Sequence, residues 1–155
     1  MMDGQWRHRR PSIWVLLFLP LLFLTWSYAL MAPLGASPDE PAHAIQAAAV
    51  VRGKALATAT DTDQGTHLPV VQVPAYLLGI DVRCWAHRPE IPATCMKPFD
   101  HTDNTAIAAT TSAYNYPPLY YALVGWWTLP IHSTKAIYLM RLTSGAIFSA
   151  TCATG

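Results

Sequence analysis

Residues 13–31 read IWVLLFLPLLFLTWSYALM and contain no charged side chain. At about 1.5 Å of rise per residue, a helix from Ile13 to Pro33 covers roughly 30 Å, which is the thickness of a bilayer's hydrocarbon core. A helix is the expected state there, because in lipid it satisfies its own backbone hydrogen bonds. The sequence therefore predicts a transmembrane helix over residues 13–33.

The charges on either side of this segment indicate its orientation. Arg7, Arg9 and Arg10 precede it, whereas residues 36–40 contain two acids and no base. Since Lys and Arg stay on the cytoplasmic side, we expect a cytoplasmic tail at residues 1–12 and an extracytoplasmic block from residue 34, in the cell (plasma) membrane. A cleaved signal peptide is the alternative, with a small-x-small site at 27–29, although its apolar core is usually only about 7–15 residues long.

The composition supports a membrane protein. Of the 155 residues, 52% are hydrophobic and only 12% are charged, whereas soluble proteins average roughly 25% charged residues. A net charge of +1 implies no nucleic-acid partner. Residues 34–116 hold eight acids and five bases and cannot lie in lipid. We therefore expect a mainly α, integral, multi-pass membrane protein with a large extracytoplasmic first loop that contains membrane-surface helices.

Local signals predict elements within the loop domain at residues 34–116. Ser37 followed by Glu40 is a capping-box pattern, and Gly53 suits a helix C-cap, so a helix is expected at about 38–52, lying along the membrane surface. Residues 67–80 contain two prolines and are expected to be extended. A short helix is expected near 105–111.

Two further apolar segments follow the loop. Residues 117–131 begin with a proline pair and are rich in Tyr and Trp. A helix from Pro118 to Leu129 is about 18 Å long, which favours an interfacial or re-entrant helix over the alternative, a full span ending at Ile131. Residues 136–155 are expected to start the next transmembrane helix, truncated at the chain end, as in the N-terminal piece of a longer protein.

Cys84 and Cys95 both fall in the extracytoplasmic block, where disulfides persist. We expect a disulfide between them. Two free thiols, or bridges to a partner, are the alternatives. Their spacing does not match a CxxC metal or redox motif.

The strongest candidate for chemistry is Asp39-Glu40, with His43 one turn later. Asp39 and His43 are four residues apart and share a helix face. An acid pair beside a membrane helix is suited to general-base catalysis on a polar acceptor, or to holding a divalent cation such as Mg, Ca or Mn. The simpler interpretation is that these residues only start a helix, because acids are favoured at helix N-termini.

Two further candidates concern ligand binding. Tyr116 and Tyr120 belong to an aromatic segment that either lines a lipid or sugar site or only anchors the chain at the interface. Arg141 lies in an apolar run, where an ionisable residue is a functional candidate. Its guanidinium suits a lipid phosphate, and snorkelling to the interface is the alternative.

The order of several motifs resembles a known family. They are SPDEPAH (37–43), VQVPAYL (71–77), the Cys84 and Cys95 pair, YNYPPLYYAL (114–123) and Met140-Arg141-Leu142. Together they resemble the N-terminal part of a bacterial multi-pass membrane family, domain of unknown function two-one-four-two. That family is similar to the GT-C glycosyltransferases, such as protein mannosyltransferases and aminoarabinose transferases.

This resemblance implies a function and assigns residues to it. The donor would be a polyprenyl-phosphate-linked sugar, the acceptor a glycan of the cell envelope, and the bilayer a further partner. By the resemblance, Asp39 or Glu40 would be the catalytic base or metal ligand, the PPLYY stretch would belong to a helix lying on the membrane, and Arg141 would lie near the donor phosphate. The residues themselves add His43, Tyr116 and Tyr120 as expected substrate contacts. Later membrane helices are missing, so the chain alone is expected to be inactive. The alternative is a non-catalytic, membrane-anchored binding or assembly protein.

Overall fold

The computed structural model describes residues 6–37, 39–54 and 68–154. The first five residues of the expected cytoplasmic tail lie outside this part. The chain divides into two compact units. Unit 1 comprises residues 1–32 and 141–155, and unit 2 comprises residues 33–140.

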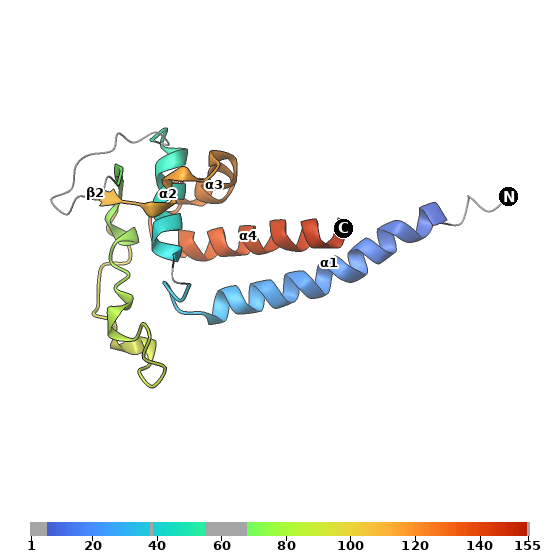
Figure 1. Ribbon diagram of the computed structural model, residues 1–155, viewed down its shortest axis with the longest axis horizontal. Coiled ribbons are helices and arrows are strands. Elements are labelled where there is room, and N and C mark those ends of the chain that lie inside the picture. The colour runs from blue at the N-terminus through green and yellow to red at the C-terminus, as the bar shows by residue number, and fades with distance from the viewer. Residues whose placement is uncertain (1–5, 38, 55–67, 155) are drawn as a thin grey trace. The chain divides into compact units, whose positions relative to one another are not determined.

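Unit 1 is a pair of antiparallel helices, α1 (Trp6–Met31) and the C-terminal part of α4 (Lys135–Thr154) (Figure 1). The indole N–H of Trp26 donates to the carbonyl of Leu142 at 2.9 Å. The hydroxyls of Thr25 and Ser149 lie 3.3 Å apart. A Cβ at Gly145 would come within 3.0 Å of Thr25, so small residues permit the close approach of the two helices.

Both helices of unit 1 have the length and composition of membrane spans, over Ile13–Met31 and Lys135–Thr154. The large apolar side chains of α1 are largely exposed within the chain, including Leu16 at 70% and Phe23 at 72%. Surface of this kind suits lipid rather than water. The expected apolar helix is therefore present, and it ends at Met31, two residues before the expected boundary.

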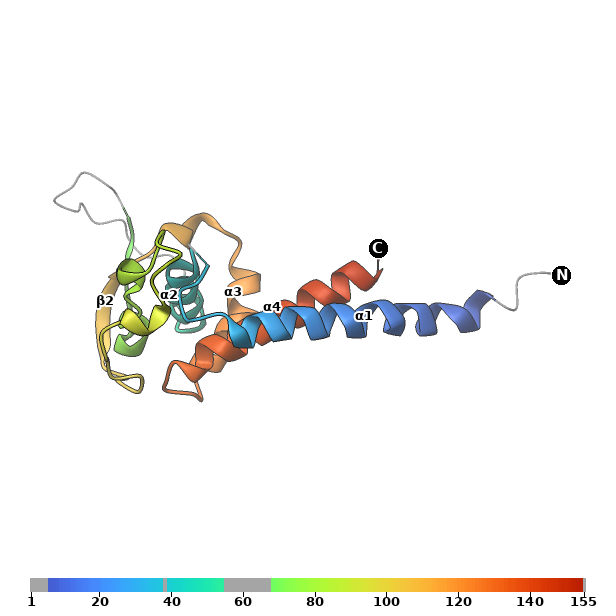
Figure 2. The ribbon, with the colours of Figure 1, turned by 90° about the horizontal axis from the view of Figure 1, so that it is seen from below.

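Unit 2 is built around α2 (Glu40–Val51). Six consecutive residues of this helix, Ala44–Ala49, are buried. The helix expected at about 38–52 is therefore present, and its position along the membrane surface stays a prediction. In Figures 1 and 2, strand β2 and helix α3 both lie beside α2. Its small alanines allow neighbours to pack on several sides.

The structure contradicts the expected start of α2 and confirms its expected end. The N-cap is Asp39, not Ser37, and its side chain makes no capping hydrogen bond; the predicted capping box is therefore wrong. At the other end, Gly53 adopts φ +71°, and the N–H groups of Gly53 and Lys54 donate to the carbonyls of Val50 and Ala49. This geometry confirms the glycine-terminated end of the helix.

A two-stranded antiparallel sheet covers part of α2. Strand β1 (Val70–Pro74) pairs with β2 (Ala106–Thr110), with Val70 opposite Thr110 and Pro74 opposite Ala106. The extended segment expected at 67–80 is confirmed over β1. The short helix expected near 105–111 is wrong, because pairing with β1 supplies that segment's backbone hydrogen bonds and overrides its local preference.

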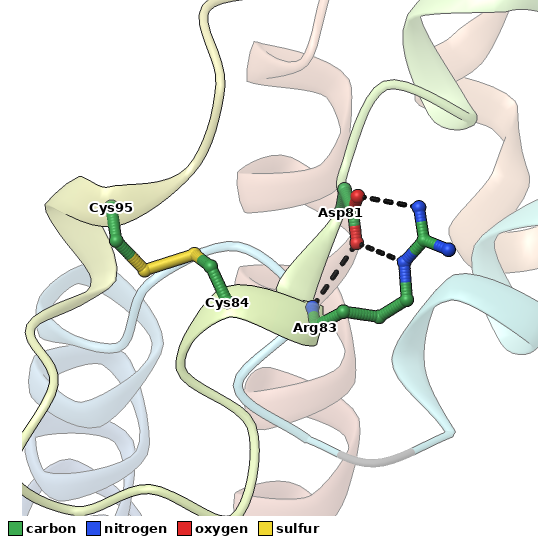
Figure 3. Close-up of polar contacts among 4 residues, drawn as sticks. All are labelled: Asp81, Arg83, Cys84 and Cys95. Carbon is green, nitrogen blue, oxygen red and sulfur yellow. Dashed lines mark hydrogen bonds and ion pairs between the residues drawn. A yellow bond between two sulfur atoms is a disulfide. The ribbon is translucent and has the colours of Figure 1, made fainter.

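The segment between the strands is held by a disulfide and an ion pair (Figure 3). Cys84 and Cys95 are bonded, with an S–S distance of 2.07 Å, and they end the one-turn 3-10 helices Val82–Cys84 and Ala93–Cys95. Asp81 accepts hydrogen bonds from the backbone N–H and the guanidinium of Arg83. These bonds lower the pKa of the Asp81 carboxyl to about 2.

Helix α3 (Pro118–Gly125) continues into a 3-10 turn at Trp126–Thr128. Eight residues of α-helix cover about 12 Å, which is too short to cross a bilayer, so the alternative of a continuous span ending at Ile131 is wrong. The buried face of this segment consists of Tyr121, Val124, Gly125 and Thr128. This face packs against α2.

We predict that Gly125→Ala destabilises unit 2 by about 1–3 kcal/mol, because the added methyl would run into the carbonyl of Ala47 on α2. Urea unfolding in detergent, followed by tryptophan fluorescence, measures the change. The control is Ala122→Ser, at an exposed position of the same helix, which should change the free energy of unfolding by less than about 0.5 kcal/mol. Equal effects of the two substitutions would contradict the close contact.

We also predict that replacing both Cys84 and Cys95 by serine lowers the free energy of unfolding by about 3 kcal/mol, because the short closed loop no longer restricts the unfolded chain. The same urea titration tests it. Cys152→Ser is the matched control, since Cys152 is exposed and outside the disulfide. A double variant as stable as this control would show that the disulfide contributes nothing.

Candidate functional site

The candidate site begins at the N-terminus of α2, where Asp39 and His43 lie one turn apart. The backbone N–H of His43 donates to the carbonyl of Asp39 at 3.1 Å, which sets this spacing. Asp39 is exposed, and its carboxylate makes no capping hydrogen bond to the helix. The carboxylate is therefore accessible to a ligand.

Glu40, the neighbouring acid, has a different environment. It is half-buried, and its carboxylate accepts the backbone N–H of Gly35 at 2.6 Å. Gly35 has φ +76°, a conformation that favours glycine, and a Cβ there would collide with Val82. Glu40 thus stabilises the turn that leads into α2. Of the two acids, Asp39 is the better placed for chemistry.

His43 joins α2 to α3 through a hydrogen bond. Its Nδ1 lies 2.6 Å from the hydroxyl oxygen of Tyr121, a residue that is only 1% exposed. Burial, and secondarily Tyr120 and Tyr116, raise the pKa of Tyr121 to about 12. The hydrogen bond occupies Nδ1 of His43 and leaves Nε2 as the other polar atom of the ring.

Aromatic rings surround this histidine. The ring centroid of Tyr116 lies 5.6 Å from that of His43, and Tyr120 meets Tyr121 edge-on at 5.4 Å. Tyr116 and Tyr120 are exposed. The structure thus brings His43 and Tyr116 together in unit 2, with Asp39 one turn before His43. Glu40 instead contacts Gly35, and Tyr120 contacts Tyr121.

Sequence reasoning missed two residues that hold this arrangement. Tyr121 positions His43, and the hydroxyl of Thr111 donates to the carbonyl of Ala42 at 2.8 Å, which ties the segment before α3 to α2. One feature of the sequence could have indicated that Tyr121 is buried. Tyr121 lies three, four and seven residues before the other buried positions Val124, Gly125 and Thr128, a spacing that marks one helix face.

Arg141 lies in unit 1, on α4, and not among the residues of unit 2. Its guanidinium donates to the carbonyls of Ala29 and Ala32 at 2.9 and 2.7 Å. Cationic side chains commonly bind the last carbonyls of a helix, as here at the end of α1. Its role in binding a donor phosphate stays a prediction.

The structure adds no further ligands for a metal. Within residues 6–37, 39–54 and 68–154, no three His, Cys, Asp or Glu side chains come together in a way that could hold a metal ion. A divalent cation at Asp39 and Glu40 therefore stays a prediction, and the chemistry below is derived without one.

The arrangement has the chemical features of a site for a polar, hydroxyl-bearing ligand. The exposed Asp39 carboxylate is an acceptor for hydroxyl protons, and Nε2 of His43 is a second polar atom able to form a hydrogen bond. Aromatic rings with a few polar groups are typical of small-molecule sites.

In the comparison with protein families, the family described as predicted membrane protein, DUF2142, matches residues 21–153. Comparisons with curated proteins and with solved structures find no match.

We predict that stability falls as the pH rises from about 10 to about 12, and that Tyr121→Phe reduces this fall. The folded-state pKa of Tyr121 lies above its ordinary value of 10.0. The stabilisation is therefore complete below pH 10 and is lost as the pH approaches 12. Tyr76, whose pKa is also raised by burial, contributes equally in both proteins.

At neutral pH, Tyr121→Phe should cost about 1 kcal/mol through the lost hydrogen bond to His43. Tyr114→Phe, at an exposed position, is the matched control. Urea unfolding at a series of pH values measures both effects. Identical pH profiles for the wild type and Tyr121→Phe would refute the buried hydroxyl's role.

Proposed function

Because the chain belongs to the DUF2142 family of predicted membrane proteins, we propose that it forms part of a membrane glycosyltransferase. Membership of this family implies association with a lipid bilayer. The proposed donor is a sugar linked to polyprenyl phosphate, and the proposed acceptor is a glycan of the cell envelope. Support comes from the resemblance to GT-C enzymes and from the site at the start of α2.

The exposed carboxylate of Asp39 is the observation that carries this proposal. Seven residues separate it from Met31, where the apolar helix α1 ends. In the proposed reaction, Asp39 takes the proton of an acceptor hydroxyl while the hydroxyl oxygen attacks the anomeric carbon of the sugar. The bond from that carbon to the phosphate oxygen breaks, and polyprenyl phosphate leaves with the electron pair. General-base catalysis of this kind contributes roughly 10²–10⁴-fold in rate.

Other residues bind and orient ligand in this proposal. His43 hydrogen-bonds a sugar hydroxyl through Nε2, because its Nδ1 is already bonded to Tyr121. Tyr116 presents an exposed ring beside it, and Tyr120 presents an exposed ring beside Tyr121. Glu40 does not contact ligand in this proposal; its carboxylate stabilises the turn at Gly35. Arg141 is proposed to hold the donor phosphate.

A non-catalytic binding or assembly role is the second candidate. The hydrogen bond between Glu40 and Gly35 favours it, because it gives one acid of the predicted pair a purely structural role at the helix start. In this case Asp39 contributes only the favourable interaction of an acid with a helix N-terminus.

We predict that Asp39→Asn in the full natural protein lowers sugar transfer at least about 100-fold, because asparagine cannot take up the acceptor proton. Membranes that contain the protein are supplied with polyprenyl-phosphate-linked sugars, and mass spectrometry detects modified envelope glycans. Asparagine is as good an N-cap as aspartate, so the amount of folded protein should not change.

Glu90→Gln is the control, because Glu90 is an exposed acid outside the candidate site. It should transfer sugar at the wild-type rate. If Asp39→Asn also retains the wild-type rate, Asp39 is not the base. If neither the wild type nor a variant modifies any glycan, while Asp39→Asn leaves envelope assembly in cells intact, the non-catalytic role is favoured.

A further inference from the structure

Helix α3 and the turn after it have an exposed apolar face. Leu119, Leu123 and Trp126 follow one another at spacings of four and three residues, so they project from the same side. Their exposed fractions are 73%, 55% and 59%. Tyr121 and Val124, on the opposite side, are 1% and 3% exposed and pack toward α2. The segment is thus apolar on both faces, and the residues that the structure describes cover only one of them.

No charged residue occurs anywhere near this face in the sequence. Residues 104–134 contain no Asp, Glu, Lys or Arg, and Asp103 and Lys135 bound the stretch. About a quarter of the residues in average soluble proteins are charged. An exposed helix face within 31 uncharged residues is therefore poorly suited to water, and equally to a protein partner that is recognised through charge.

The residue types on and beside this face indicate what covers it. Trp126, Tyr116 and Tyr120 are exposed and amphipathic, with an apolar ring and one hydrogen-bonding group each. Such residues concentrate where acyl chains meet lipid headgroups, because that boundary offers both environments. Leucines beside them supply the purely apolar contact.

The chain also connects this face directly to a candidate membrane span. The turn ends at Thr128, and the apolar helix α4 begins at Lys135, with six residues between them. The first residues of α4, up to Met140, belong to unit 2 together with α3. The first residues of the candidate membrane span α4 therefore belong to the same compact unit as the exposed face.

We propose that this face of α3 docks on the bilayer at the boundary between headgroups and acyl chains, with Leu119, Leu123 and Trp126 in contact with lipid. The occupant is the membrane surface itself. The opposite side of the same helix holds Tyr121 against His43, so α3 separates the candidate site from lipid by about one helix diameter, roughly 10 Å. The docking surface does not depend on the proposed transferase activity.

Site-specific labelling of the full chain tests the proposal. In a Cys152→Ser background, single cysteines at Leu119, Leu123 and Trp126 carry a bimane fluorophore, while Cys84 and Cys95 are in their disulfide and do not react. The protein is reconstituted in vesicles of phosphatidylcholine and phosphatidylglycerol. Quenching is measured with a nitroxide on the lipid acyl chain and with iodide in the water. Gln72→Cys and Ala108→Cys, exposed positions on the two strands, are the controls.

The expected result is that all three α3 positions are quenched several-fold more by the lipid nitroxide than the two strand positions, and less by iodide. Iodide quenching on α3 equal to that at Gln72 would show that the face lies in water and would overturn the proposal. Protection from both quenchers would show that protein covers the face, either another segment or a second copy, and would overturn it equally.

Discussion

The close packing of α3 on α2 is the constraint on which unit 2 depends. Gly125 lies directly against the backbone of Ala47, with no room for a Cβ. Small residues at this contact allow two helices to approach closely, and the approach then determines the polar contacts at either side. Near one end, Tyr121 reaches His43, and near the other, Arg52 donates to the carbonyl and hydroxyl of Thr128 at 2.8 Å. The candidate site is therefore a consequence of helix packing.

The two adjacent acids show how the same residue type acquires different roles from its surroundings. Glu40 is turned to Gly35, where its carboxylate satisfies an N–H group that the turn would otherwise leave without a partner. Asp39, one position earlier, is the N-cap residue by backbone geometry, but its carboxylate does not cap the helix. A sequence pattern of two acids before a helix cannot make this distinction. It depends on the left-handed turn at Gly35.

Much of the local structure could be predicted from the sequence, because it depends on neighbouring residues. The apolar helix ending at Met31, the helix end at Gly53 and the family of the chain all follow from short patterns. The pairing of β1 with β2 and the burial of α2 could not be predicted in this way. They depend on contacts between segments that are not neighbours in the sequence, such as Val70 with Thr110, for which hydrophobic periodicity carries no signal. The bond between His43 and Tyr121 spans 78 residues and was missed for the same reason.

The two faces of α3 connect the family's membrane character with the geometry of the site. A helix that packed on α2 with its only apolar stripe would present polar residues outward, as surface helices of soluble proteins do. In α3 the outward side is instead leucine and aromatic, and the inward side contains the buried hydroxyl of Tyr121. Packing on α2 accounts for the inward residues alone. The outward residues require a second apolar environment, and with lipid in that place a polyprenyl-linked ligand could reach His43 while its polyprenyl chain stays in the membrane.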